Sequence, residues 1–182
     1  ENSHRVLNVS GNIEDHTVFK NLTIAFGRPG PDDHASALKV NGCQATFFQV
    51  IIEQNGGGTG NTVAYGSGSG LTLFDRCIVR NNLVENYAGL RAAKVRKSIL
   101  HNNVGWNNTG VLLDCESYNC TVYGNGGGAG NPWTSSGLSG GLARNCIFWN
   151  NSAQAAYNPE SVEYSLNSGH TGEGNIDGDP MF

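Results

Sequence analysis

The sequence has no long apolar run and no strong excess of charge of either sign. No segment approaches the ~20 consecutive apolar residues that a membrane-spanning helix requires, so we predict no membrane span. Charged residues make up 14% of the 182 residues, and the formal net charge is −4 with a pI near 5.7. Because proteins that bind nucleic acid usually present a basic surface, we also expect no nucleic-acid partner.

Motifs that mark common catalytic and metal sites are scarce as well. The five cysteines are odd in number and lack C-x-x-C spacing, which argues against a zinc site and a complete disulfide framework. The glycine-rich stretches 56–60 and 66–70 lack the Lys-Ser/Thr that completes a phosphate loop, and no nucleophile elbow occurs. We therefore expect no cofactor and no metal, and the sequence identifies no catalytic residue.

Glycine is abundant, with 26 residues, and a short segment recurs along the chain. The glycine content favours short strands joined by tight turns. We call the second residue of each recurring segment the anchor. Successive anchors are 28, 27, 21, 22 and 26 residues apart: Leu22, Val50, Cys77, Ser98, Cys120 and Cys146. These steps are typical of solenoid repeats.

Two further features recur in phase with the anchor. A second short apolar strand lies between anchors, around Leu38, Ala64, Leu90, Leu112 and Leu138. Five residues after the anchor stands an asparagine in five of six copies, with Gly27 in the first: Asn55, Asn82, Asn103, Asn125 and Asn151. Three features in phase over most of the chain indicate one repetitive architecture.

The repeat predicts an all-β fold, a right-handed parallel β-helix of about six to seven coils that forms a single domain over residues 1–182. Alternation along each strand puts the anchor and the second residue after it in the interior. The recurring asparagines are expected to form an amide ladder and to adopt the left-handed conformation of a sharp turn. Cys77, Cys120 and Cys146 then occupy one interior column, with a Cys120–Cys146 disulfide as the alternative. The repeat gives no position for Cys43 and Cys115.

The third residue after each anchor points outward and supplies a candidate ligand-binding strip. In four consecutive coils these residues are Arg80, His101, Tyr123 and Trp149. If the coils stack in register, they form one exposed row along the axis. Aromatic rings beside hydrogen-bonding and cationic groups suit a sugar chain. The alternatives are that a sheet surface simply tolerates aromatic residues, or that a loop covers them.

Charged residues gather in two further places. The acidic stretches 177–179 and 32–34 match no full calcium loop, and Asp-Gly and Asp-Pro are ordinary turn sequences, so we expect no metal there. A basic cluster is offset in part by Glu53, Asp75 and Glu85. It is compatible with acidic polysaccharide chemistry or with a solvated basic face: Arg76, Arg80, Arg91, Lys94, Arg96 and Lys97.

Three stretches carry a resemblance to a known family. They are Glu1-Asn-Ser-His-Arg-Val-Leu7, the repeated Asn-Cys-Ile/Thr with its following asparagines, and residues 174–182. The pattern resembles the bacterial surface-protein family of right-handed β-helix repeats, within the pectin-lyase-like superfold, and especially its polymorphic-outer-membrane-protein-like and choice-of-anchor members. The superfold hosts lyases, hydrolases, adhesins and phage spikes, so the resemblance implies a fold more than an activity. It also implies an exported protein, extracellular or at the cell surface.

We therefore expect a non-catalytic module for adhesion, for glycan or protein binding, or for surface structure, with a polysaccharide or a surface protein as partner. Two alternatives stay open: a polysaccharide lyase or glycoside hydrolase of this superfold, and a structural subunit of a larger surface assembly. Open solenoid ends expose sheet edges and apolar core. The chain is accordingly expected to be a segment of a longer protein, or to associate with another chain through its coil ends.

Overall fold

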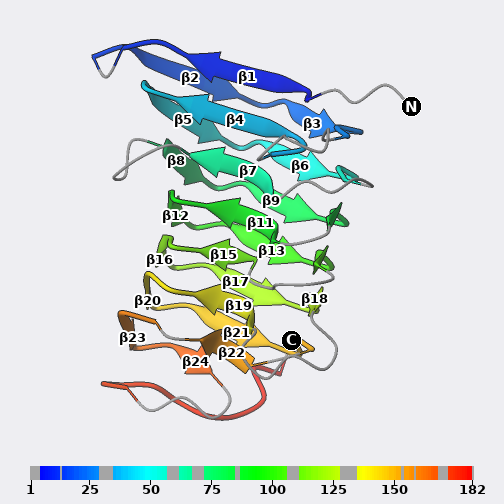
Figure 1. The fold of residues 1–182 in the computed structure, drawn as a ribbon. Coiled ribbons are helices and arrows are strands. Elements are labelled where there is room, and N and C mark those ends of the chain that lie inside the picture. The colour runs from blue at the N-terminus through cyan, green and yellow to red at the C-terminus, as the bar shows by residue number, and fades with distance from the viewer. Residues whose placement is uncertain are drawn as a thin grey trace.

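The computed structural model describes residues 5–12, 14–28, 35–56, 62–66, 72–84, 87–105, 111–127, 135–152, 154–157, 159–167 and 172–181. The regular elements of these residues are all β-strands, stacked along one axis from the N-terminal end to the C-terminal end (Figure 1). The strands form three long sheets of seven strands and one short sheet of three. Within the described part of the chain, no helix has the length and apolarity to cross a membrane.

Each sheet takes one strand from each successive coil. The first sheet contains β1 (Leu7–Ser10), β4 (Leu38–Asn41), β7 (Thr62–Gly66), β11 (Tyr87–Arg91), β15 (Leu112–Leu113), β19 (Ser135–Ser139) and β22 (Gln154–Tyr157). The second contains β2 (His16–Lys20), β5 (Gln44–Phe48), β8 (Thr72–Asp75), β12 (Lys94–Arg96), β16 (Glu116–Tyr118), β20 (Leu142–Arg144) and β23 (Ser161–Glu163).

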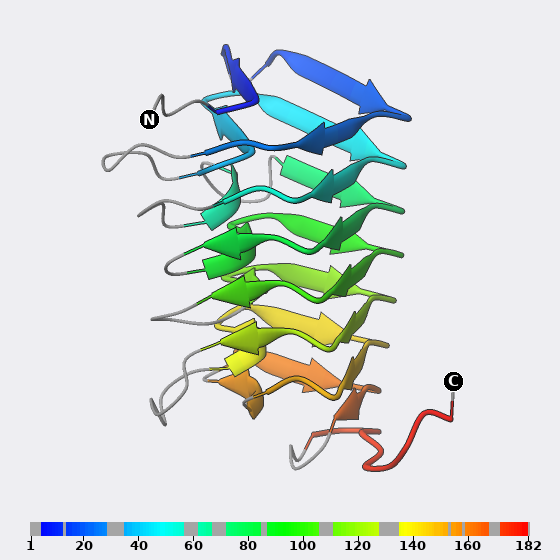
Figure 2. The same ribbon diagram turned by 90° about the vertical axis from the view of Figure 1, so that its right-hand side faces the viewer.

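The third sheet contains β3 (Thr23–Ala25), β6 (Ile51–Glu53), β9 (Ile78–Arg80), β13 (Ile99–His101), β17 (Thr121–Tyr123), β21 (Ile147–Trp149) and β24 (Leu166–Asn167). The short fourth sheet contains β10 (Leu83–Val84), β14 (Val104–Gly105) and β18 (Gly126–Gly127). Strands pair in parallel with their equivalents one coil away, as the stacked layers of Figure 2 show. This arrangement confirms the predicted parallel β-helix.

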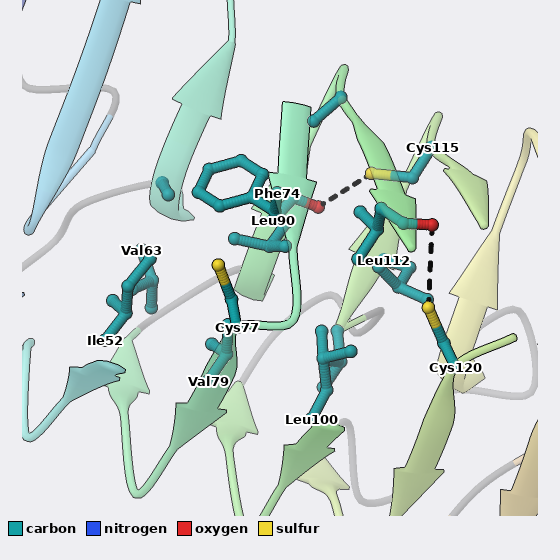
Figure 3. Packing of buried hydrophobic residues seen from close by; sticks show 14 of the residues in the cluster. Ile52, Val63, Phe74, Cys77, Val79, Leu90, Leu100, Leu112, Cys115 and Cys120 are labelled. Atoms are coloured by element: carbon teal, nitrogen blue, oxygen red, sulfur yellow. Dashed lines mark hydrogen bonds between the residues drawn. The ribbon is translucent and has the colours of Figure 1, made fainter. Parts of the chain in front are cut away.

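The core is a set of apolar columns that run along the axis. In the third sheet the middle residue of each strand points inward, and these side chains are at most 2% exposed: Ile24, Ile52, Val79, Leu100, Val122 and Phe148. Figure 3 shows Ile52, Val79 and Leu100 in this position. In the second sheet, Phe47 stacks on Phe19 and on Phe74 with ring centroids 5.0 Å apart. Coil spacing of about 4.8 Å matches ring stacking, so identical residues in successive coils pack face to face.

The corners between sheets depend on residues in the left-handed conformation. The corner from the second to the third sheet has φ values of 49° to 56° at the residue before the anchor: Asn21, Gln49, Arg76, Lys97, Asn119, Asn145 and Tyr164. The corner after the third sheet has such residues at Gln54, Asn81, Asn102 and Asn150. These residues lie one position before the recurring asparagines. The expectation that the recurring asparagines themselves are left-handed is therefore wrong, because their side chains point inward and the preceding residue makes the bend.

The recurring asparagines form the predicted amide ladder. Nδ2 of Asn55 donates to Oδ1 of Asn82, and the same bond links Asn82 to Asn103, Asn103 to Asn125 and Asn125 to Asn151, at 2.8 to 3.0 Å. Each Oδ1 also accepts the backbone N–H of the preceding asparagine. In the first coil, the N–H of Gly27 donates to Oδ1 of Asn55. The ladder therefore satisfies buried backbone groups at every coil it crosses.

All five cysteines are buried free thiols. Cys77, Cys120 and Cys146 lie at anchor positions as predicted, and the backbone N–H of Cys120 donates to Sγ of Cys146 at 3.5 Å. Sγ of Cys77 donates to the carbonyl of Phe47, and Cys115, which the repeat does not place, makes the equivalent contact to Leu90 (Figure 3). The thiols thus act as small apolar groups that fill interior space beside the corners between sheets.

The buried thiols are expected to be unreactive in the native protein. All five thiols are at most 2% exposed, so a reagent in solution cannot reach them. Burial also raises the pKa of Cys77 to about 11 and that of Cys115 to about 12, and the thiolate is the reactive form. At pH 8, a disulfide reagent that reports free thiols should detect almost none in the native protein and five after unfolding in denaturant. Rapid modification of any thiol in the native state would contradict this arrangement.

The C-terminal end of the stack is covered in part by the chain's own tail, residues 172–181. Ile176 forms a parallel bridge with Leu166 of β24. Asn175 accepts the backbone N–H of Ser165 at 2.9 Å and donates to the carbonyl of Val162 at 2.8 Å. The side chain of Asn175 thus takes the place that the next anchor would occupy.

Candidate functional site

The predicted strip lies on the outer surface of the third sheet. Arg80, His101, Tyr123 and Trp149 each end a strand of this sheet and are register partners in successive coils. Glu53 of β6 continues the row on the other side of Arg80. All five side chains are half-buried rather than fully exposed. We call this row the aromatic column. The in-register stacking on which the prediction depended is present.

The cation of the aromatic column, Arg80, is paired with the carboxylate of Glu53. Nε of Arg80 donates to Oε2 of Glu53 at 2.8 Å, and the two side chains are 37% and 21% exposed. Because the two residues are register partners in adjacent coils, the stacking itself brings the opposite charges together. Arg80 is therefore not an isolated positive charge on this surface.

His101 and Tyr123 stack on each other. Their ring centroids are 4.9 Å apart and the ring planes are 4° from parallel. One face of each ring is consequently turned along the axis toward the other ring. Coil spacing favours such stacking between side chains at equivalent positions. The sheet surface therefore presents the ring edges of this pair.

The environment of His101 favours the neutral form of its ring. Burial of the ring and, second, the positive charge of Arg80 lower the pKa of His101. Its Nδ1 atom is buried and has no hydrogen-bond partner among the described residues. A neutral imidazole adds no second cation to the aromatic column.

An apolar row, which the sequence analysis did not single out, runs beside the aromatic column. Its members lie two residues earlier in each strand and are register partners: Thr23, Ile51, Ile78, Ile99, Thr121, Ile147 and Leu166. We call it the isoleucine row. The side chain of Ile99 is 41% exposed. The recurrence of isoleucine directly after the anchor was the available signal. The third-sheet surface therefore combines an apolar row with a polar and aromatic one.

The basic cluster of the sequence does not form one site. Arg91 lies on the first sheet, with its guanidinium 5.5 Å from the ring centroid of Tyr65. Lys94 and Arg96 lie on the second sheet, where they pair with Glu116 at 3.2 Å and with Asp75 at 2.9 Å. The left-handed residue Ala92 separates the two surfaces. Glu85, expected to offset the cluster, lies outside the described residues.

Of the two acidic stretches, only residues 177–179 lie within the described part of the chain. Asp177 and Asp179 lie in the exposed C-terminal tail, whereas residues 32–34 fall outside the described residues. Over the described ranges, no group of three or more His, Cys, Asp and Glu side chains is arranged to hold a metal ion.

The fold defines the chain as an all-parallel β-solenoid protein, built from repeats that stack along one axis. Comparison with protein-family models, with curated proteins and with solved structures finds no match. The class of protein thus follows from its strand topology.

Proposed function

We propose that the protein is a non-catalytic, extracellular or cell-surface binding module, and that the third-sheet surface binds an extended glycan along the stack axis. The observation that carries this proposal is the pairing of the aromatic column with the isoleucine row on one face. Both rows repeat once per coil. A polymer that lies along the axis would meet the same kind of contact at each coil.

Sugar rings are amphipathic, and this surface matches that property. Their C–H faces can pack on the isoleucine row and on ring edges, while hydroxyl groups can bond to Arg80, to the Tyr123 hydroxyl and to the Trp149 indole N–H. Three of the five aromatic-column positions are rings with polar atoms. Such side chains lose little conformational entropy when a ligand binds.

The test is a glycan array followed by affinity measurements with Tyr123→Ala and Trp149→Ala. We expect each substitution to weaken binding of the best glycan by at least about tenfold, as for a central aromatic contact. Tyr118→Ala is the matched control, because Tyr118 also ends a strand and is half-buried, but on the second sheet. It should leave affinity unchanged.

Ultraviolet absorbance recorded in the same wells detects the unsaturated products of a lyase. An increase with any polysaccharide would contradict a non-catalytic role. Absence of binding across the array would reject the glycan proposal, and so would equal losses in the Tyr118 and Tyr123 variants.

A further inference from the structure

The charges on the third-sheet surface are balanced, and this balance bears on which glycans it accepts. Among the described residues, Arg80 has one ion pair, to Glu53 at 2.8 Å. The next position of the column, His101, has a buried Nδ1 atom without a partner among the described residues, and burial and the charge of Arg80 lower its pKa, which favours the neutral ring. The remaining positions, Tyr123 and Trp149, are uncharged, as is the isoleucine row.

Other cations lie beyond the ends of these strands and not within the row itself. Arg28 lines a pocket with Gln54 and Asn81, the chain neighbours of Glu53 and Arg80. Arg76 and Lys97 lie at the corner before the anchor, four residues before Arg80 and His101 respectively. The Arg76 guanidinium also lies over the ring of Phe48, on the second-sheet side of the corner.

We propose that Glu53 is a specificity-determining residue, which masks Arg80 so that the third-sheet surface selects neutral glycans and rejects acidic ones. This inference rests on the proposed glycan-binding function. A uronate or sulfate group placed on Arg80 would also approach the Glu53 carboxylate, and like charges at an interface are strongly unfavourable. A neutral sugar hydroxyl accepts a hydrogen bond from the guanidinium without that repulsion.

The experiment compares Glu53→Gln with Glu116→Gln. Both substitutions remove one negative charge and free one cation, but Glu116 pairs with Lys94 on the second sheet. The probes are a neutral glucan and galactan, and polygalacturonate as the acidic chain, each titrated into the purified protein at low and at physiological salt. Thermal melting of each variant confirms that it is folded.

We expect the unmodified protein to bind a neutral chain at least about tenfold more tightly than polygalacturonate. Glu53→Gln should raise the affinity for polygalacturonate by about tenfold or more relative to the affinity of the same variant for the neutral chains, with a gain that shrinks as salt increases. Glu116→Gln should show no gain.

Two results would overturn the assignment of Glu53: tighter binding of polygalacturonate by the unmodified protein, or equal gains in the two variants, which would indicate a general charge effect. These results differ from failure of the proposed function itself, in which no chain of either kind binds.

Discussion

Replacing Asn103 by alanine is expected to destabilise the protein by about 3–5 kcal/mol. Nδ2 of Asn103 donates to the carbonyl of Val79 at 2.9 Å and to Oδ1 of Asn125 at 3.0 Å, and its Oδ1 accepts both the backbone and side-chain N–H groups of Asn82. The side chain is fully buried. Its removal leaves several buried groups unpaired, and each costs about 1–3 kcal/mol.

The adjacent Asn102 supplies the matched control for this measurement. It is the same residue type, but it is exposed and has a φ of 54°. Asn102→Ala should lower the free energy of unfolding by only about 1 kcal/mol, because alanine adopts the left-handed conformation less readily than asparagine does. Equilibrium unfolding in urea measures both variants. Similar losses at the two positions would show that turn conformation, and not the buried ladder, stabilises this corner.

A second large effect is expected for Gly56→Ala, with a loss of about 3 kcal/mol or more. A Cβ atom at this position would lie 1.6 Å from the carbonyl oxygen of Leu83, which belongs to the next coil, and the φ of Gly56 is 130°. Backbone of the neighbouring coil cannot move aside without breaking the stack. The free-energy costs of overpacking and of an unfavourable φ for alanine therefore add.

Gly126→Ala tests whether the Gly56 effect is local. Gly126 lies in β18 of the short sheet, to which Gly56 is joined by its bridge with Leu83 of β10, and it is the register partner of Val104. A Cβ atom there would meet nothing closer than 3.5 Å, so the substitution should change the free energy of unfolding by no more than about 0.5 kcal/mol. Thermal melting of both variants measures this difference in stability. A Gly56→Ala protein as stable as Gly126→Ala would argue against the close approach of these coils.

The parts of the fold that depend on periodicity could be predicted from the sequence. Interior positions such as Ile52 and Val79, the asparagine ladder, and the register of Arg80 with His101 follow from residues that recur at one phase of the repeat. Stacking fixes them because each coil must pair with the next along its whole length. The five-residue offset from the anchor therefore predicted contacts between residues 21 to 27 positions apart.

Features that depend on side-chain direction or on a single non-repeating residue could not be predicted in the same way. The stacking of His101 on Tyr123 depends on rotamers, which the outward position alone does not define. Ala92 adopts a φ of 52° although alanine rarely favours that conformation, so nothing in the sequence showed that Arg91 and Lys94 would lie on different surfaces. The tail from residue 172 onward lies beyond the last repeat copy and has no periodic signal.

The tail has a consequence for how molecules of this kind can join end to end. Polymerisation through the C-terminal end would require an incoming strand to pair with β24, where Ile176 already forms a bridge. It would also have to replace Asn175, which satisfies the N–H of Ser165 and the carbonyl of Val162. Pairing of another strand with this edge of β24 therefore requires residues 175 and 176 to leave it first.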